Sequence, residues 1–154
     1  MKRIISIKLT AVILLLFSTI SLFAQYKIGI SWEFNEDGNL QGWTASPNFS
    51  NIEVKDSLLT ATVAGSFPYL ASEAFNISAS DYRFIFIKMK LPGATSAKIM
   101  WNNDSGEWGF YWFPVYADTT FHEYRLPVFL RDQWRGQITG IQKLDFNQIG
   151  RAHV

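Results

Sequence analysis

Beyond residue 25 the chain has no helical periodicity, and this limits the fold more than any other feature of the sequence. No window of a dozen residues repeats apolar positions at spacings of three and four without interruption by Gly, Pro or β-branched residues. Short aromatic and β-branched runs alternate instead with turn residues, roughly every 10 residues. These runs predict strands near 28–34, 51–56, 58–64, 82–91, 96–102, 107–116, 121–127 and 137–146. We therefore expect an all-β protein, an antiparallel β-sandwich of jelly-roll type.

The first 24 residues have the pattern of an export signal. A basic start, Met1-Lys2-Arg3, precedes an apolar stretch over 9–23 that ends at Ala24. The alternative is a membrane anchor, but a span needs about 20 uninterrupted apolar residues, and Ser and Thr interrupt this one. We expect cleavage after Ala24 and a protein that is secreted, periplasmic or at the cell surface, with no membrane segment after cleavage.

The last six residues, 149–154, are interpreted as an artefact. Their codons can be written so that they match the start of a common short-read sequencing adapter, and the alternative is a native hydrophilic tail. The expected domain is therefore 25–148. On this interpretation the sandwich could lack its final strand through truncation, and the intact gene would join it covalently to a downstream domain. Nothing from residue 149 onward is expected to carry function.

Charge and composition exclude several classes of function. Between residues 25 and 148 the net charge is −3 with no run of like charges, which argues against a nucleic-acid partner. The chain has no Cys and two His, so thiolate metal sites, Cys nucleophiles and His-dependent triads have little material. Aromatic residues are plentiful instead, with 13 Phe, 6 Trp and 6 Tyr.

One aromatic group lies around a polar loop and suggests a sugar-binding surface. Indole and phenol rings stack on the apolar faces of sugars, while amides and carboxylates at the rim bind hydroxyls. The predicted stacking residues are Trp101, Trp108, Trp112 and Tyr69, and the predicted polar contacts are Asn102, Asp104 and Glu107. In the alternative interpretation these tryptophans fill the core, as Trp43 and Trp134 are expected to do.

Strand parity leaves this choice open. Along 107–116 the side chains of both faces are aromatic, with Trp108, Phe110 and Trp112 on one face and Tyr111 and Phe113 on the other. Such a strand is either covered on both faces by other layers or presents one aromatic face to solvent.

Evidence for a metal or catalytic site is weaker. Glu33, Asp37 and Asp145 could hold a structural calcium ion, although solvated turn carboxylates explain them equally simply. No cofactor is expected to be required. His122, Tyr124 and Arg125 offer groups that a polysaccharide lyase could use, but alternation along the strand puts Arg125 on the opposite face from the other two.

Several segments together resemble known domains. The opening pieces 32–35 (Trp-Glu-Phe-Asn) and 37–43, then 58–63, 82–90, Trp101, 122–126, 134–136 and 144–145 resemble carbohydrate-binding-module-like, galactose-binding-like jelly-roll domains. Such domains occur in secreted proteins of the Bacteroidetes type, often beside glycoside hydrolases or lyases. The resemblance implies a closing strand after Asp145. It also implies a calcium site in some relatives, for which Glu33 loosely matches the first ligand. The second ligand is expected in the closing strand, which on the truncation interpretation lies beyond residue 148, and Asp145 is the candidate within the present sequence.

These observations favour a non-catalytic polysaccharide-binding module of an exported and larger carbohydrate-active or cell-surface protein. Two alternatives stay open at this point. The first is a structural spacer in which all six tryptophans are internal, and the second is a small secreted lyase or hydrolase.

Overall fold

Nearly all the regular structure is antiparallel β-sheet, as the sequence predicts. The computed structural model describes residues 28–146 and 151–153, with side chains from 28 to 141. Seven of the eight predicted strands are present, and the described residues contain no α-helix. The elements are β1 (Thr44–Ala45), β2 (Phe49–Lys55), β3 (Leu58–Val63), β4 (Leu70–Ala71), β5 (Ile77–Ser78), β6 (Ile85–Met89), β7 (Ser96–Asn103), β8 (Trp108–Pro114), β9 (His122–Leu126), the 3₁₀ turn η1 (Val128–Leu130), β10 (Gln137–Phe146) and β11 (Arg151–His153).

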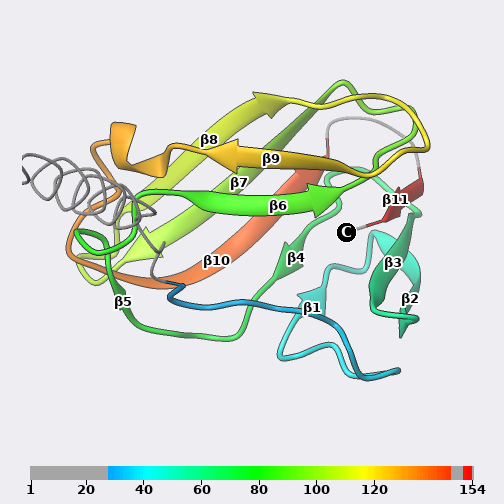
Figure 1. The fold of residues 1–154 in the computed structure, drawn as a ribbon, viewed down its shortest axis with the longest axis horizontal. Coiled ribbons are helices and arrows are strands. Elements are labelled where there is room, and N and C mark those ends of the chain that lie inside the picture. Colours follow the sequence, from blue (N-terminus) through cyan, green and yellow to red (C-terminus); the bar gives the residue numbers. More distant parts are fainter. Residues whose placement is uncertain (1–27, 147–150, 154) are drawn as a thin grey trace, which may run out of the picture.

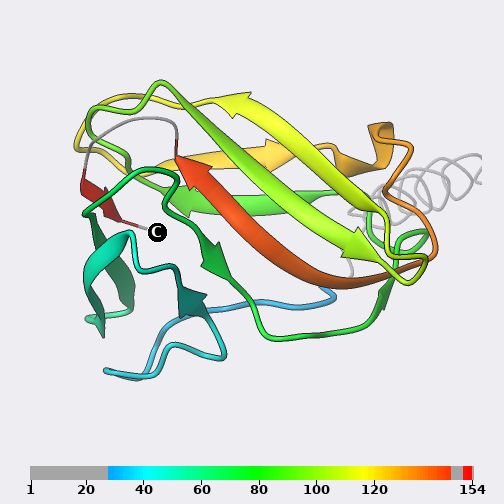
Figure 2. The same ribbon diagram turned by 180° about the vertical axis from the view of Figure 1, so that it is seen from behind.

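The strands form a sandwich-like arrangement of two main layers. One layer is a four-stranded sheet with the order β5-β10-β7-β8, and the other contains the pair β6-β9. Figure 1 shows β6 and β9 in front of the larger sheet, and Figure 2 shows the same layers from behind. The strand β8 is an edge of its sheet, since within the described residues it pairs with β7 alone. The two outer faces of the sandwich therefore belong to different sheets.

The hairpin β2–β3 illustrates how local sequence sets the register. Asp56 and Ser57, the two residues between the strands, both have positive φ, as type I′ hairpin turns require. The backbone N–H of Asp56 also donates to the Asp37 carboxylate at 3.0 Å, which ties the earlier turn to this one. The strands then pair from Lys55 with Leu58 to Phe49 with Val63, across one irregularity. The boundary between the strands predicted at 51–56 and 58–64 is confirmed.

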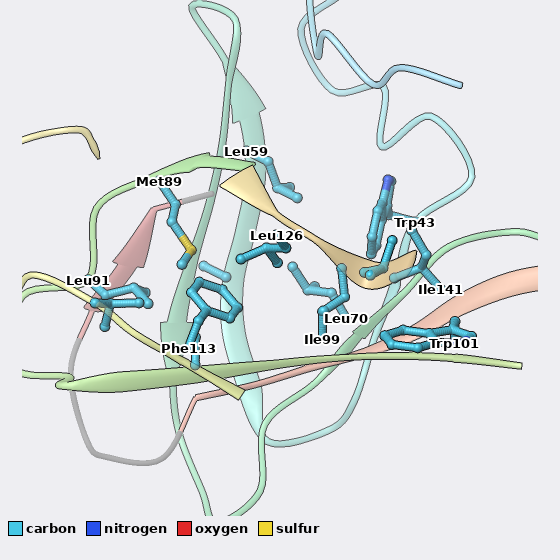
Figure 3. Close-up of a cluster of buried hydrophobic side chains, with 14 of the residues drawn as sticks. Trp43, Leu59, Leu70, Met89, Leu91, Ile99, Trp101, Phe113, Leu126 and Ile141 are labelled. Atoms are coloured by element: carbon cyan, nitrogen blue, oxygen red, sulfur yellow. The ribbon is translucent and has the colours of Figure 1, made fainter. Parts of the chain in front are cut away.

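The core lies between the two layers. Figure 3 shows Met89 and Leu126 from the β6-β9 pair facing Ile99, Trp101 and Phe113 from β7 and β8. Leu70 and Ile141 continue this cluster, and Trp43 lies at its border. Trp43 and Trp134 are both buried, as predicted for structural tryptophans, and Trp134 Nε1 donates to the carbonyl oxygen of Tyr82 at 2.7 Å.

The strand predicted at 28–34 is wrong. Residues 28–34 form no β-ladder, and Phe34 has a positive φ that interrupts extended backbone. Trp32 and Phe34 of this segment nevertheless pack against the core, and Trp32 meets Trp43 edge-on with ring centroids 5.0 Å apart, whereas Ile28 is exposed. Its hydrophobic pattern indicated burial, not pairing. The short strands β1, β4 and β5, of two residues each, were not predicted.

The ends of the chain are only partly described. The predicted export signal, 1–24, lies outside the described residues, as do 149, 150 and 154. The described part of the tail, β11, pairs antiparallel with β3. Among the described residues, no helix is long and apolar enough to cross a membrane. The interpretation of 149–154 as an artefact stays a prediction.

Candidate functional site

Three aromatic side chains of the edge strand β8 point away from the core. Trp108, Phe110 and Trp112 are 47%, 51% and 41% exposed, whereas on the opposite face of the strand Gly109 and Phe113 are buried and Tyr111 is half-buried. Alternate residues of a strand share a face and follow one another at about 7 Å, so the row is about 13 Å long. We call Trp108, Phe110 and Trp112 the β8 stripe. Of the two outcomes that parity left open, the structure shows the exposed aromatic face.

The neighbouring strand β7 flanks the stripe residue by residue. Lys98 lies opposite Trp112, Met100 opposite Phe110 and Asn102 opposite Trp108. The ammonium group of Lys98 lies 4.9 Å from the centroid of the Trp112 ring, a cation–π contact that restrains this indole and puts positive charge at one end of the stripe.

Trp101 does not belong to this surface, so its predicted role in stacking is wrong. Its side chain is fully buried, because in β7 it has the parity of the core residues Ala97 and Ile99. The indole meets Trp134 edge-on at 5.2 Å, and its Nε1 donates to the carbonyl oxygen of Gln133 at 3.1 Å. Trp101 is thus a core residue that also anchors the 133–134 turn.

The loop between β7 and β8 is organised by the buried side chain of Asn103. Its Oδ1 accepts hydrogen bonds from the backbone N–H groups of Ser105 and Glu107, at 3.1 and 3.0 Å. Its Nδ2 donates to Glu107 Oε2 at 3.1 Å. Asn103 therefore holds Glu107 beside Trp108, at the start of the stripe. It was not predicted as a site residue, because an Asn in a polar loop looks the same whether it faces inward or outward.

Glu107 forms an ion pair with a residue far along the chain. Arg135 donates from Nη2 to Glu107 Oε1 at 2.7 Å and from Nε to Oε2 at 3.2 Å. The hydrogen bond from Arg135, followed by that from Asn103, holds the pKa of Glu107 below its ordinary value. The predicted polar group at this end of the stripe is therefore a carboxylate–guanidinium pair. No sequence signal joined two residues 28 positions apart.

This ion pair predicts a measurable change in titration. A carboxyl whose pKa is lower in the folded state stabilises the protein above its unfolded pKa, and this contribution is lost as the pH falls through the folded value. In Arg135→Gln we expect the pKa of Glu107 to move up toward its ordinary value, as followed by NMR titration of the side-chain carboxyl carbon.

Because both groups are largely solvated, added salt should reduce the difference between the two proteins. Lys55→Gln, which removes a charge from an exposed strand end, is the control and should leave the titration of Glu107 unchanged. An unchanged Glu107 pKa in Arg135→Gln would contradict the assigned pairing.

The other predicted polar residues are placed less favourably for a ligand. Asn102 donates from Nδ2 to Thr139 Oγ1 at 2.7 Å, and its Oδ1 is buried with no hydrogen bond. Asp104 is exposed at the loop tip, and its carboxylate lies so near Gly136 that a side chain at this glycine would collide with it. Of the three predicted polar residues, Glu107 is therefore the one that lies directly before Trp108, the first residue of the stripe.

Tyr69 lies apart from the β8 stripe. It directly precedes β4, and its backbone N–H donates to Ser46 Oγ at 3.1 Å. The chain after β4 runs beside β10, where the N–H of Ser72 donates to the carbonyl oxygen of Ile141 at 2.9 Å. The strands β10 and β7 therefore separate this segment from β8 (Figure 2). The predicted extension of the aromatic surface by Tyr69 is not formed.

The structure does not bring the predicted calcium ligands together among the described side chains. Glu33 is exposed in the unpaired opening segment, and Asp145 lies in β10 opposite Lys98, with its side chain outside the described part. Among the described residues, no three His, Asp or Glu side chains gather as a metal site would need. Asp37 is used as an acceptor in the turn contact with Asp56. Calcium binding stays a prediction.

A pocket of about 370 Å³ lies elsewhere, along the edge of β6 that faces β3. Its walls are mainly apolar and include Trp32, Leu59 and Ile87, with Glu33 and Lys88 as the charged members. Trp43 also lines it, and the buried Nε1 of this indole has no hydrogen-bond partner. The pocket lies over Ile99 and Ile141, whose side chains belong to the core, and therefore not on the β8 face.

The one histidine with a described side chain has an acidic neighbour. His122 Nε2 lies 3.0 Å from Asp118 Oδ1, and its ring stacks on Tyr116 at 4.3 Å. The pKa of Asp118 is lowered by the backbone N–H of Thr120 and then by His122. His122 and Tyr124 share a face, as predicted, with ring centroids 6.4 Å apart. The Asp118 carboxylate is thus a partner for the His122 ring. Among the described residues, no Ser or Thr hydroxyl forms a hydrogen bond with that ring.

No protein-family model and no curated protein matches this chain.

Proposed function

We propose that this chain is a non-catalytic polysaccharide-binding module that uses the β8 stripe to hold its ligand. In this proposal it is exported, its fold is of the jelly-roll type that its sequence resembles, and it serves a larger carbohydrate-active or cell-surface protein. The observation that carries the proposal is the exposure of three aromatic rings in one row on a regular strand. A soluble domain seldom leaves so much contiguous aromatic surface to water without a binding role.

The row has the chemistry that a sugar chain needs. Aromatic rings at successive alternate positions can stack on several rings of one extended polymer. Charged groups lie at both ends, Lys98 beside Trp112 and the Glu107–Arg135 pair beside Trp108, and they can bind hydroxyl groups. Because the rings stand on a strand and not on a loop, they are held in place before the ligand arrives. Tethering of a catalytic domain to its polymer would make even weak affinity useful.

The spacer alternative required six internal tryptophans. Trp108 and Trp112 are exposed, so that form of the alternative does not fit the molecule.

The test is binding of the full chain to a panel of neutral plant, algal and host polysaccharides, followed by intrinsic tryptophan fluorescence. We expect Trp108→Ala and Trp112→Ala each to weaken binding by at least about tenfold, since a central aromatic contact commonly contributes about 1.4 kcal/mol or more. Phe67→Ala removes a still more exposed aromatic side chain away from the stripe and should bind normally.

Circular dichroism establishes that each variant is folded. Failure of the folded chain to bind any neutral polysaccharide of the panel would overturn the proposal, and so would equal losses in Phe67→Ala and Trp108→Ala.

A further inference from the structure

The outer face of the β6-β9 pair carries a second, chemically different surface. In β6 the residues Ile85, Ile87 and Met89 face the core, so Phe86 and Lys88 point away from it. Arg125 of β9 lies opposite Phe86, and Phe86 is 60% exposed. This pair of strands is the front layer in Figure 1 and the rear layer in Figure 2, so its outer face is turned away from the β8 stripe.

Arg125 of this surface and Arg83, which lies two residues before β6, are each stacked on a phenylalanine ring. The guanidinium carbon of Arg125 lies 3.7 Å from the centroid of the Phe84 ring, and that of Arg83 lies 4.1 Å from the centroid of Phe129. The two rings themselves meet edge-on, with centroids 5.5 Å apart. Each guanidinium group is therefore stacked on one ring of a phenylalanine pair, and these contacts restrict its movement.

Further positive charge lies on the same face. Lys88 is exposed next to Phe86, and the ammonium of Lys90 lies 4.9 Å from the centroid of the Phe121 ring. Glu123, opposite Lys88, is the carboxylate within the two strands, and Asp81 and Asp132 lie just outside them. We call Arg83, Lys88, Lys90 and Arg125, with Phe84, Phe86 and Phe129, the β6-β9 basic patch. The net charge of this patch is positive, although the net charge of residues 25–148 as a whole is negative.

The stacking decides which ligands fit. Planar guanidinium groups bind carboxylate and sulfate oxygens through paired N–H donors, which a flexible ammonium does not do. Single-stranded nucleic acid needs open aromatic faces on which bases stack, but here arginines cover one face each of Phe84 and Phe129. The patch thus offers ordered cations and little free ring surface.

From this arrangement we infer that the β6-β9 basic patch is a second binding site, which takes an acidic polysaccharide bearing uronate carboxylates or sulfate esters. The two guanidinium groups bind successive acidic groups of the polymer, Lys88 and Lys90 extend the positive track, and Phe86 packs against a sugar ring. This inference does not depend on the proposed role of the β8 stripe, because the two surfaces belong to opposite layers.

The experiment measures binding of the full chain at 0.15 M salt to polygalacturonate, which carries carboxylates, to dextran sulfate and to neutral dextran. We expect binding to one or both acidic polymers and weakening of that binding as salt is raised. Preference for polygalacturonate would identify the carboxylate as the ligand group, and preference for dextran sulfate the sulfate. Single-stranded DNA is measured alongside.

Variants test the assigned residues. Arg83→Gln/Arg125→Gln should lose at least tenfold in affinity for the acidic polymer. Arg83→Lys/Arg125→Lys keeps the charge and should lose most of the same affinity, because the paired donors and the stacking are gone. Lys88 makes neither of the two arginine–phenylalanine contacts, and Lys88→Gln should lose affinity for the acidic polymer several-fold. This single variant tests the patch even if the double variants do not fold. Trp108→Ala and the charge control Lys55→Gln should bind as the original chain does.

Three results would overturn the inference. The first is absence of binding to both acidic polymers, and the second is an equal loss in Lys55→Gln, which would indicate net charge alone. The third is tighter binding to single-stranded DNA than to either polymer. Loss of neutral-polysaccharide binding in Trp108→Ala with intact acidic binding would separate this site from the proposed function of the β8 stripe.

Discussion

Trp101→Ala is expected to lower the free energy of unfolding by about 3–5 kcal/mol, the usual cost of removing a large buried aromatic side chain. The indole is fully buried, packs edge-on against Trp134 and donates a hydrogen bond to the 133–134 turn. Removal leaves a cavity beneath the four-stranded sheet and an unpaired carbonyl at Gln133. Urea unfolding followed by far-UV circular dichroism measures the change, and the melting temperature should fall by roughly 10–20 °C.

The matched control is Trp112→Ala, which removes the same side chain from an exposed position of the neighbouring strand. It should cost less than half as much, because Trp112 is already 41% exposed and lies outside the core. If both variants lost the same stability, the burial assigned to Trp101 would be wrong.

A substitution at Gly109 tests the burial of Trp101 in a second and more specific way. The Trp101 ring lies across this glycine in the neighbouring strand, and a Cβ built there would collide with the indole. Gly109→Ala should therefore cost about 1–3 kcal/mol by overpacking. In a Trp101→Ala background the same substitution meets an empty space and should cost almost nothing. Additive effects in this double-mutant cycle would contradict the contact.

Asn103→Ala should lower the free energy of unfolding by about 2–3 kcal/mol, because a buried side chain with three assigned hydrogen bonds is lost. Two backbone donors of the loop, at Ser105 and Glu107, would be left without their acceptor, and Glu107 would lose one of its two side-chain partners. We also expect faster amide hydrogen exchange at Ser105 and Glu107, measured by NMR, since these groups would open to water.

Asp104→Ala is the control from the same loop. Asp104 is exposed, so its replacement should change stability by no more than about 0.5 kcal/mol. Asn103→Asp keeps an acceptor for the two backbone donors but puts a carboxylate beside Glu107. It should be destabilised at neutral pH and should approach the original protein as acid neutralises the two groups. Equal stability of Asn103→Ala and Asp104→Ala would show that Asn103 does not organise the loop.

The strands of the sandwich were largely predictable, because alternation of apolar and polar residues is a local property of the chain. The segments predicted at 51–56, 58–64, 96–102 and 137–146 correspond closely to β2, β3, β7 and β10. The failure at 28–34 has the same origin. An apolar pattern reports that side chains will be buried, and whether the backbone also finds a partner strand depends on residues elsewhere.

The candidate site was predictable in part for the same reason. Parity placed Trp108, Phe110 and Trp112 on one face of one strand. The prediction nevertheless assigned Trp101 and Asn102, adjacent residues of the strand before, to the same surface, although alternation along a strand puts them on opposite faces. Parity alone could not say which of two aromatic faces would be covered. The indole of Trp101 is buried in the core and packs against Trp134 and the 133–134 turn, a contact between segments distant in sequence.

The amino-acid sequence by itself therefore determined the β class, the positions of most strands and the grouping of aromatic residues by face, since all three follow from spacing along the chain. Only the tertiary structure decided which face meets water, that Glu107 pairs with Arg135, that Tyr69 lies away from the stripe and that Arg83 and Arg125 stack on neighbouring phenylalanines. These features depend on how layers and loops from separate parts of the chain come together, and no local pattern of residues encodes that packing.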